Sequence, residues 1–140
     1  MTIAGIRAAL ATGLSSAGLG TTEGYYHEQL SFTGDIAGYP QLTEWNPRIG
    51  GGTLGGGTNA TQEWTLTTMH RFTGLNVADA VLDLEALLTD AALAAIEGAN
   101  FSTHADGCVV TRVYDFGEYR VSDKRAIGCK LDVTVYGVSA

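Results

Sequence analysis

The fold is decided by an alternating stretch near the end of the chain, RAIGCKLDVTVYGV, which runs from Arg125 to Val138. Every second residue from Ile127 to Val135 is apolar. The residues that alternate with them would lie on the opposite face of a strand: Gly128, Lys130, Asp132, Thr134 and Tyr136. Side chains of a β-strand share a face at a spacing of two residues. The stretch therefore predicts a half-buried strand with one covered face, which is typical of an antiparallel sheet.

Other strands are predicted from the segments before it. GCVVTRVYDFGEYRV should pair with the last strand as a hairpin, whose polar turn is Ser122–Arg125. In QEWTLTTMHRF, Gln62–Phe72, threonines and an aromatic residue alternate strictly, which favours a strand. The aromatic-rich segment Gly24–Phe32 is a further strand candidate, and a short strand fits near Gln41–Trp45.

Three helices are predicted. Thr2 can cap the first, which should end near Leu14–Ser16 and which has apolar residues at helical spacing: Ile3, Ile6, Leu10 and Leu14. Asn76 can cap a second, amphipathic helix, whose apolar stripe should pack on an apolar surface: Val77, Val81, Leu84 and Leu88. Thr89 can cap a shorter third helix, which Gly98 ends.

This order of elements predicts an α+β domain. We expect a mainly antiparallel sheet of four to five strands with the helices packed on one face. The part before the glycine-rich stretch is too short for a core of its own, so residues 1–140 are expected to form one domain with a long glycine-rich loop at about 46–60.

Composition and charge exclude several classes of protein. A hydrophobic content of 45% with 16% charged residues is globular, and a net charge of −7 argues against nucleic-acid binding. Cys108 and Cys129 are too far apart for a metal ribbon or redox motif and are expected to be buried free thiols. The N-terminus lacks the basic region of a signal peptide, and no apolar run is long enough for a membrane span, so the chain is expected to be intracellular during synthesis.

No catalytic, metal or cofactor site is predicted. The run GGGTLGGGTN lacks the preceding buried strand, the following helix and the lysine of a phosphate-binding loop, so we expect an adaptable loop. His27, His70 and His104 are isolated; His27 and His70 could be cross-strand neighbours, yet ordinary sheet histidines are favoured over metal ligands. No serine lies in a G-x-S-x-G elbow, and neither Cys108 nor Cys129 has an adjacent histidine.

The whole-chain pattern nevertheless resembles the tail terminator, or tail-completion, proteins of long-tailed bacteriophages. The resemblance is carried by the opening MTIAGIRAALATGL, by the strand EWTLTTMHRF leading into DAVLDLEALL and DAALAAIEG, and by the closing CKLDVTVYGVSA. It covers most of the chain, but its motifs are patterns of residue classes. One departure is DIAGYPQLTEW, where Gly38 and Pro40 interrupt the compact strand of the family; Asp35–Trp45 is therefore expected to be largely irregular.

The resemblance implies a structural protein of the virion, assembled in the bacterial cytoplasm, that forms a homo-oligomeric ring, typically of six subunits. The ring would cap the head-proximal end of the tail tube, stop polymerisation of the major tail tube protein and present a surface to the head–tail connector. DNA would pass through without specific binding, and neither an enzymatic activity nor a membrane is involved.

Two alternatives remain open. The chain could be another neck component, such as a head–tail stopper. It could also be a small-ligand-binding or enzymatic α+β domain, if the aromatic residues around one region line a cavity: Tyr25, Tyr26, Trp64 and His70.

The candidate interaction residues lie in two expected projections from the sheet. The first projection is the loop from Trp45 to Thr58, with Trp45, Asn46, Pro47, Arg48, Gly50, Thr53, Leu54 and Gly57. The second is the hairpin tip, with Ser122, Asp123, Lys124 and Arg125.

Overall fold

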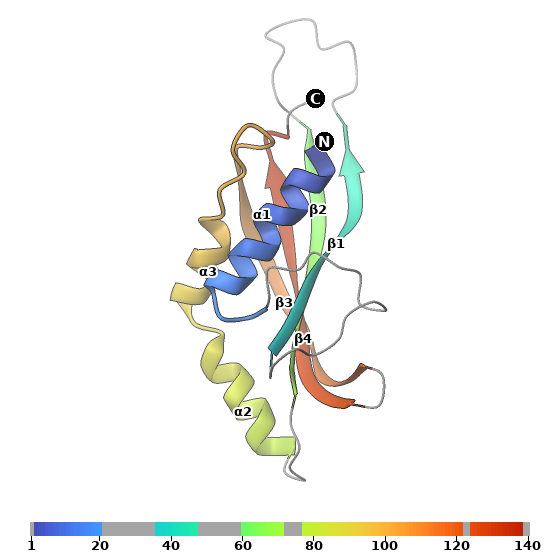
Figure 1. The fold of residues 1–140 in the computed structure, drawn as a ribbon, viewed down its shortest axis with the longest axis vertical. Coiled ribbons are helices and arrows are strands. Elements are labelled where there is room, and N and C mark those ends of the chain that lie inside the picture. Colours follow the sequence, from blue (N-terminus) through green and yellow to red (C-terminus); the bar gives the residue numbers. More distant parts are fainter. Residues whose placement is uncertain (1, 21–35, 48–59, 72–76, 122–123, 139–140) are drawn as a thin grey trace, which may run out of the picture.

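The described residues contain four strands, which form one antiparallel sheet in the order β1-β2-β4-β3. The computed structural model describes residues 2–20, 36–47, 60–71, 77–121 and 124–138. Its elements, in chain order, are α1 (Thr2–Ser16), β1 (Ile36–Asn46), β2 (Thr61–Arg71), α2 (Val77–Leu87), α3 (Asp90–Glu97), β3 (Gly107–Val121) and β4 (Lys124–Tyr136). α1 and α3 lie together over one part of the sheet, and α2 extends along the other part (Figure 1).

The main core lies between the helices and one face of the sheet. Register places Trp64 beside Val133 and Leu66 beside Leu131, and all four side chains are buried. The apolar side of α1 packs against this face through Ile6, Leu10 and Leu14, as its spacing predicted. The predicted α+β class with a mainly antiparallel sheet of four to five strands is therefore confirmed, with four strands in the described residues.

The expectation of an irregular segment over Asp35–Trp45 is wrong, because β1 is continuous from Ile36 to Asn46, apart from a bulge near Leu42. A side chain at position 38 would lie 2.8 Å from the carbonyl oxygen of Leu19, so Gly38 lets the chain after α1 approach the sheet. Among the described strands β1 lies at the edge of the sheet, where the N–H that Pro40 lacks need not break a ladder. The candidate strand Gly24–Phe32 lies outside the described residues.

The opposite face of the sheet carries a second apolar cluster, which the sequence pattern did not predict. Ala37, Tyr39, Met69 and Ala126 are buried there, and Tyr119 packs against them. β2 is consequently buried on both faces over this part of its length. The expectation that only one face of the sheet is covered is therefore not met at the end of the sheet where β1 and β4 begin.

α2 and α3 differ in how firmly they are held. Thr89 caps α3 as predicted, since its hydroxyl accepts the backbone N–H of Ala92 at 3.1 Å. In α2 only Leu84 is fully buried, and Val77 of the predicted stripe is 37% exposed. The prediction that α2 packs on an apolar surface is met by Leu84, and by Val81 and Leu88, which are partly buried and pack against the same core.

Candidate interaction surfaces

The two predicted projections leave the sheet at opposite ends. Trp45 and Asn46 finish β1 at the end where β2 begins, whereas Lys124 and Arg125 begin β4 where β3 finishes (Figure 1). Because all neighbouring strands are antiparallel, these ends are separated by the full length of the sheet. Seven candidates lie outside the described residues: Arg48, Gly50, Thr53, Leu54, Gly57, Ser122 and Asp123.

The end that holds Trp45 carries exposed aromatic side chains. Trp45 is 45% exposed and Tyr136 is 47% exposed. Asn46 donates to the hydroxyl of Thr61 at 3.5 Å, which ties the last residue of β1 to the first of β2, and Pro47 follows as an exposed residue. Large exposed aromatic residues are enriched at protein interfaces, so this end is a candidate contact surface.

The other end is charged. Arg125 donates to both carboxylate oxygens of Glu118, with its Nε at 2.8 Å and an Nη at 3.4 Å. This hydrogen bond and the positive charge lower the pKa of Glu118. The pair links the two strands of the hairpin near the turn. Because it is exposed to solvent, it contributes little to stability.

The sheet face opposite the helices carries a network of polar side chains around Asp132. Its Oδ1 accepts from Thr65 at 3.1 Å and from Tyr114 at 2.9 Å, and its Oδ2 lies 3.2 Å from the Arg112 guanidinium. That guanidinium also lies 3.8 Å from the centre of the Tyr114 ring. Since its oxygens are occupied by these partners, Asp132 has a structural role in joining three strands.

The pocket hypothesis around Trp64 and His70 is not supported by the position of Trp64. Its side chain is 1% exposed, donates to Gln62 at 3.0 Å within the core, and lies beneath the guanidinium of Arg7. Burial lowers the pKa of His70, an effect that the nearby charge of Asp83 partly opposes. Tyr25 and Tyr26 lie outside the described residues.

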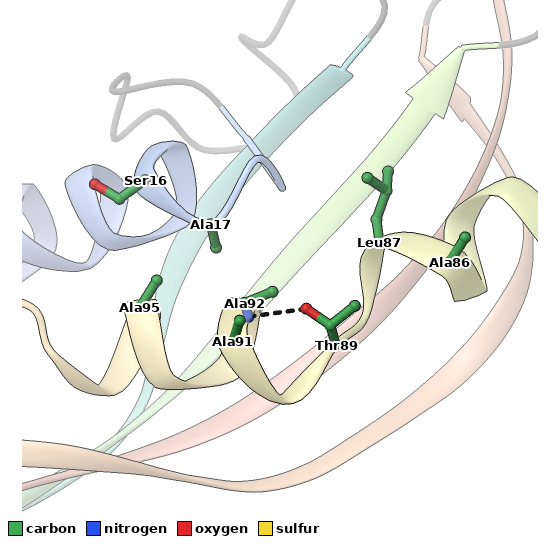
Figure 2. A pocket seen from close by; sticks show the side chains of 8 residues that line it. All are labelled: Ser16, Ala17, Ala86, Leu87, Thr89, Ala91, Ala92 and Ala95. Carbon is green, nitrogen blue, oxygen red and sulfur yellow. Dashed lines mark hydrogen bonds between the residues drawn. The ribbon is translucent and has the colours of Figure 1, made fainter.

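A groove of about 290 Å³ lies where α1 ends beside α2 and α3 (Figure 2). It was not predicted, although the alanine-rich sequence of α3 is a signal for a surface of small side chains. The hydroxyl of Thr89, one of the lining residues, points toward the backbone N–H of Ala92. The other residues that line the groove have small or apolar side chains: Ser16, Ala17, Ala86, Leu87, Ala91, Ala92 and Ala95. None of these residues is an acid or a base, so the groove suits contact with another surface rather than chemistry.

A second hollow, of about 370 Å³, separates the first half of α1 from the segment between α3 and β3. His104 is its single titratable residue, and the His104 ring lies against Gly5. Among the residues with described positions, no group of three or more potential ligands could hold a metal ion. Within the same part of the chain, no helix has the length and apolarity needed to cross a membrane.

Both cysteines are free and buried, as predicted. Burial raises the pKa of Cys108 to about 11 and that of Cys129 to about 12. The thiolate is the nucleophilic form of cysteine, so these thiols are inert at neutral pH.

The chain matches no protein-family model and no curated protein sequence.

Proposed function

We propose that this protein is a structural component of a long-tailed bacteriophage, which forms a ring at the head-proximal end of the tail tube. The ring stops polymerisation of the tube and provides the interface to the head-side connector. It is a non-catalytic assembly part. The observation that carries the proposal is a sheet with two long open edges.

Within the described part of the sheet, β1 and β3 each pair with a strand on one side only. β1 has 11 residues and β3 has 15, whereas an average strand has about 5–6. Long open edges are templates for pairing with another chain, and monomeric proteins usually shorten or cover them. The two edges therefore favour self-association.

The strand directions fit a head-to-tail contact. Since neighbouring strands alternate in direction across β1-β2-β4-β3, β1 and β3 run antiparallel to each other. A second copy that places its β1 beside β3 would continue the antiparallel alternation. The same contact repeated around an axis uses two different surfaces of each subunit, and it closes into a ring when the rotation between copies divides a full turn.

The two ends of the sheet supply the remaining contacts that the proposal needs. One end carries the exposed side chains of Trp45 and Tyr136, and the other carries the charged hairpin tip with Arg125. In a ring with aligned subunits, one end meets the tail tube and the other meets the connector. The net charge of −7 is compatible with DNA passing through without specific binding.

The test is assembly of the purified protein, alone and with tail tubes. We expect annular particles by negative-stain electron microscopy, a multiple of the subunit mass by light scattering, and rings seated on tube ends that no longer elongate. Bovine serum albumin at equal concentration is the control for crowding. A protein that stays monomeric at high concentration and never caps tubes would refute the proposal.

Blocking production of the protein in an infected cell separates it from a head–tail stopper. Loss of a terminator should give overlong or unstable tails. Loss of a stopper should leave tails of normal length that are not attached to heads.

A further inference from the structure

His70 lies near the end of β2, on the face of the sheet that carries the main core. The strand register places it between Ile36 of β1 and Ile127 of β4, and Ile127 belongs to that core. β2 ends at Arg71, and α2 begins at Val77 and runs back along the same side of the sheet (Figure 1). His70 therefore lies where the chain leaves the sheet for α2.

One nitrogen of the His70 ring is closed off from water. Nε2 is buried, and it has no hydrogen-bond partner among the described residues. A neutral imidazole carries a proton on one ring nitrogen only, whereas the imidazolium form donates from both. Protonation would therefore add a positive charge and leave both ring nitrogens as donors, where Nε2 meets no acceptor. A buried donor without a partner is unfavourable, so the packed structure favours the neutral ring.

The charges around His70 offset this effect only in part. Among the side chains that the structure describes, those with a charge near this end of the sheet, on the side of the helices, are Asp79 and Asp83 on α2, Glu118 and Arg120 on β3, and Arg125 on β4. Glu118 and Arg125 bond to each other. Asp83 raises the pKa of His70, but the larger effect of burial lowers it below the usual 6.5. The packed structure therefore binds this proton more weakly than an exposed histidine does.

α2 is the element beside His70 that is held by the fewest apolar contacts. Leu84 is its only fully buried residue, and Val77 at its start is 37% exposed. The helix has 11 residues, and helices of this length depend on tertiary packing for their stability. Segments with few buried apolar contacts open locally at a lower free energy than the whole domain unfolds. α2 can therefore leave the sheet while the strands stay paired.

We propose that His70 couples the packing of α2 to pH: the neutral ring allows α2 to lie on the sheet, and protonation of the ring releases the helix. Once α2 has moved away, water can accept the proton of Nε2 and solvate the charge. The open form therefore binds the proton more strongly than the packed form, and a fall in pH below the usual value for histidine favours opening. This device goes beyond the proposed assembly function and does not depend on it.

Hydrogen exchange of the backbone amides tests this coupling, after correction for the intrinsic effect of pH on exchange. Between about pH 7.5 and about pH 5.5, the protection of the α2 amides should fall about fivefold relative to the amides of β4. His70→Phe keeps an aromatic ring that cannot take up a proton. In this variant the ratio of α2 to β4 protection should be the same at both pH values, whatever its overall stability.

Asp83→Asn tests the sign of the effect. Because the charge of Asp83 favours the imidazolium form, its removal should lower the pKa of His70, as measured by NMR titration of the ring, and should increase the opening of α2 at about pH 5.5. Glu85→Gln is the matched control, since Glu85 is another exposed carboxylate of α2 and does not act on His70. It should behave like the unmodified protein in both measurements.

Three results would overturn the inference. The first is protection of α2 that does not change with pH, and the second is a His70→Phe variant that loses this protection as steeply as the unmodified protein. The third is an equal loss of protection in α2 and β4, which would mean that the whole domain unfolds rather than that α2 opens. Ring formation and tube capping are measured separately, so the proposed function and this inference can fail independently.

Discussion

Alanine at position 128 tests how closely the two central strands approach each other. Gly128 lies in β4, between Met69 of β2 and Gly117 of β3. A Cβ at this position would lie under 3.0 Å from the carbonyl oxygen of Thr68, and 3.1 Å from both Met69 Cγ and Tyr119 Cδ1. Because the nearest atom belongs to the backbone, β2 and β4 would have to move apart.

The size of the effect follows from two opposing contributions. Overpacking of this kind costs about 1–3 kcal/mol. Alanine in place of a strand glycine recovers about 0.5–1 kcal/mol through the lower entropy of the unfolded chain. We expect Gly128→Ala to destabilise the protein by about 1–2 kcal/mol, which corresponds to a fall in Tm of about 2–8 °C for a domain near this size.

Gly117→Ala is the matched control. Gly117 lies directly across from Gly128 on β3, and a Cβ there would have nothing within 4 Å. The control should be unchanged or slightly more stable in thermal and urea unfolding followed by circular dichroism. If Gly128→Ala is as stable as Gly117→Ala, the close approach of β2 to β4 is wrong.

Three further predictions concern the helix cap and the buried titratable groups. Thr89→Ala should lower the free energy of unfolding by about 1 kcal/mol in urea titrations, whereas Thr89→Ser, which keeps the acceptor for Ala92, should lose much less. Since burial lowers the pKa of His70 from 6.5, the unfolded chain takes up a proton first as the pH falls. Stability should therefore decrease below about pH 6.5, and His70→Leu should flatten that decrease. The raised pKa values of Cys108 and Cys129 lower the stability at high pH, because above pH 9.0 the unfolded chain releases protons that the folded chain keeps. Urea midpoints should fall between pH 9.0 and about 11, and a Cys129→Ala variant that falls as steeply would contradict this account.

The elements that could be predicted are those whose pattern is local. The alternation from Ile127 to Val135 and the capping hydroxyl of Thr89 each act within a few residues, and both have the predicted structure. The short strand predicted near Gln41–Trp45 lies within β1. Residues 36–40 were not predicted as strand, because the reason for Gly38 is a contact with Leu19, in a segment that precedes the strand. The place of Pro40 at a sheet edge could not be predicted locally, because it depends on the order of the strands.

The candidate surfaces could be predicted only in part. Trp45 and Arg125 were identified as ends of strands, and the structure adds that they belong to opposite ends of the sheet. Leu82 lies off the apolar stripe predicted for α2, and it is exposed in the structure. The exposure of Phe116 has no signal in the sequence, because it depends on the bulge that removes this residue from the β3–β4 register.

The edge of β3 is not uniform, because Glu97 of α3 accepts the backbone N–H of Val110 at 2.9 Å. An incoming strand has to begin beyond that carboxylate, and each added copy would then be displaced along the strand direction relative to the one before. Such a stagger tilts strands against the axis around which a sheet closes, and the tilt is coupled to the diameter of the resulting barrel. A single acidic side chain at the end of α3 would in this way help to set the bore of the proposed ring.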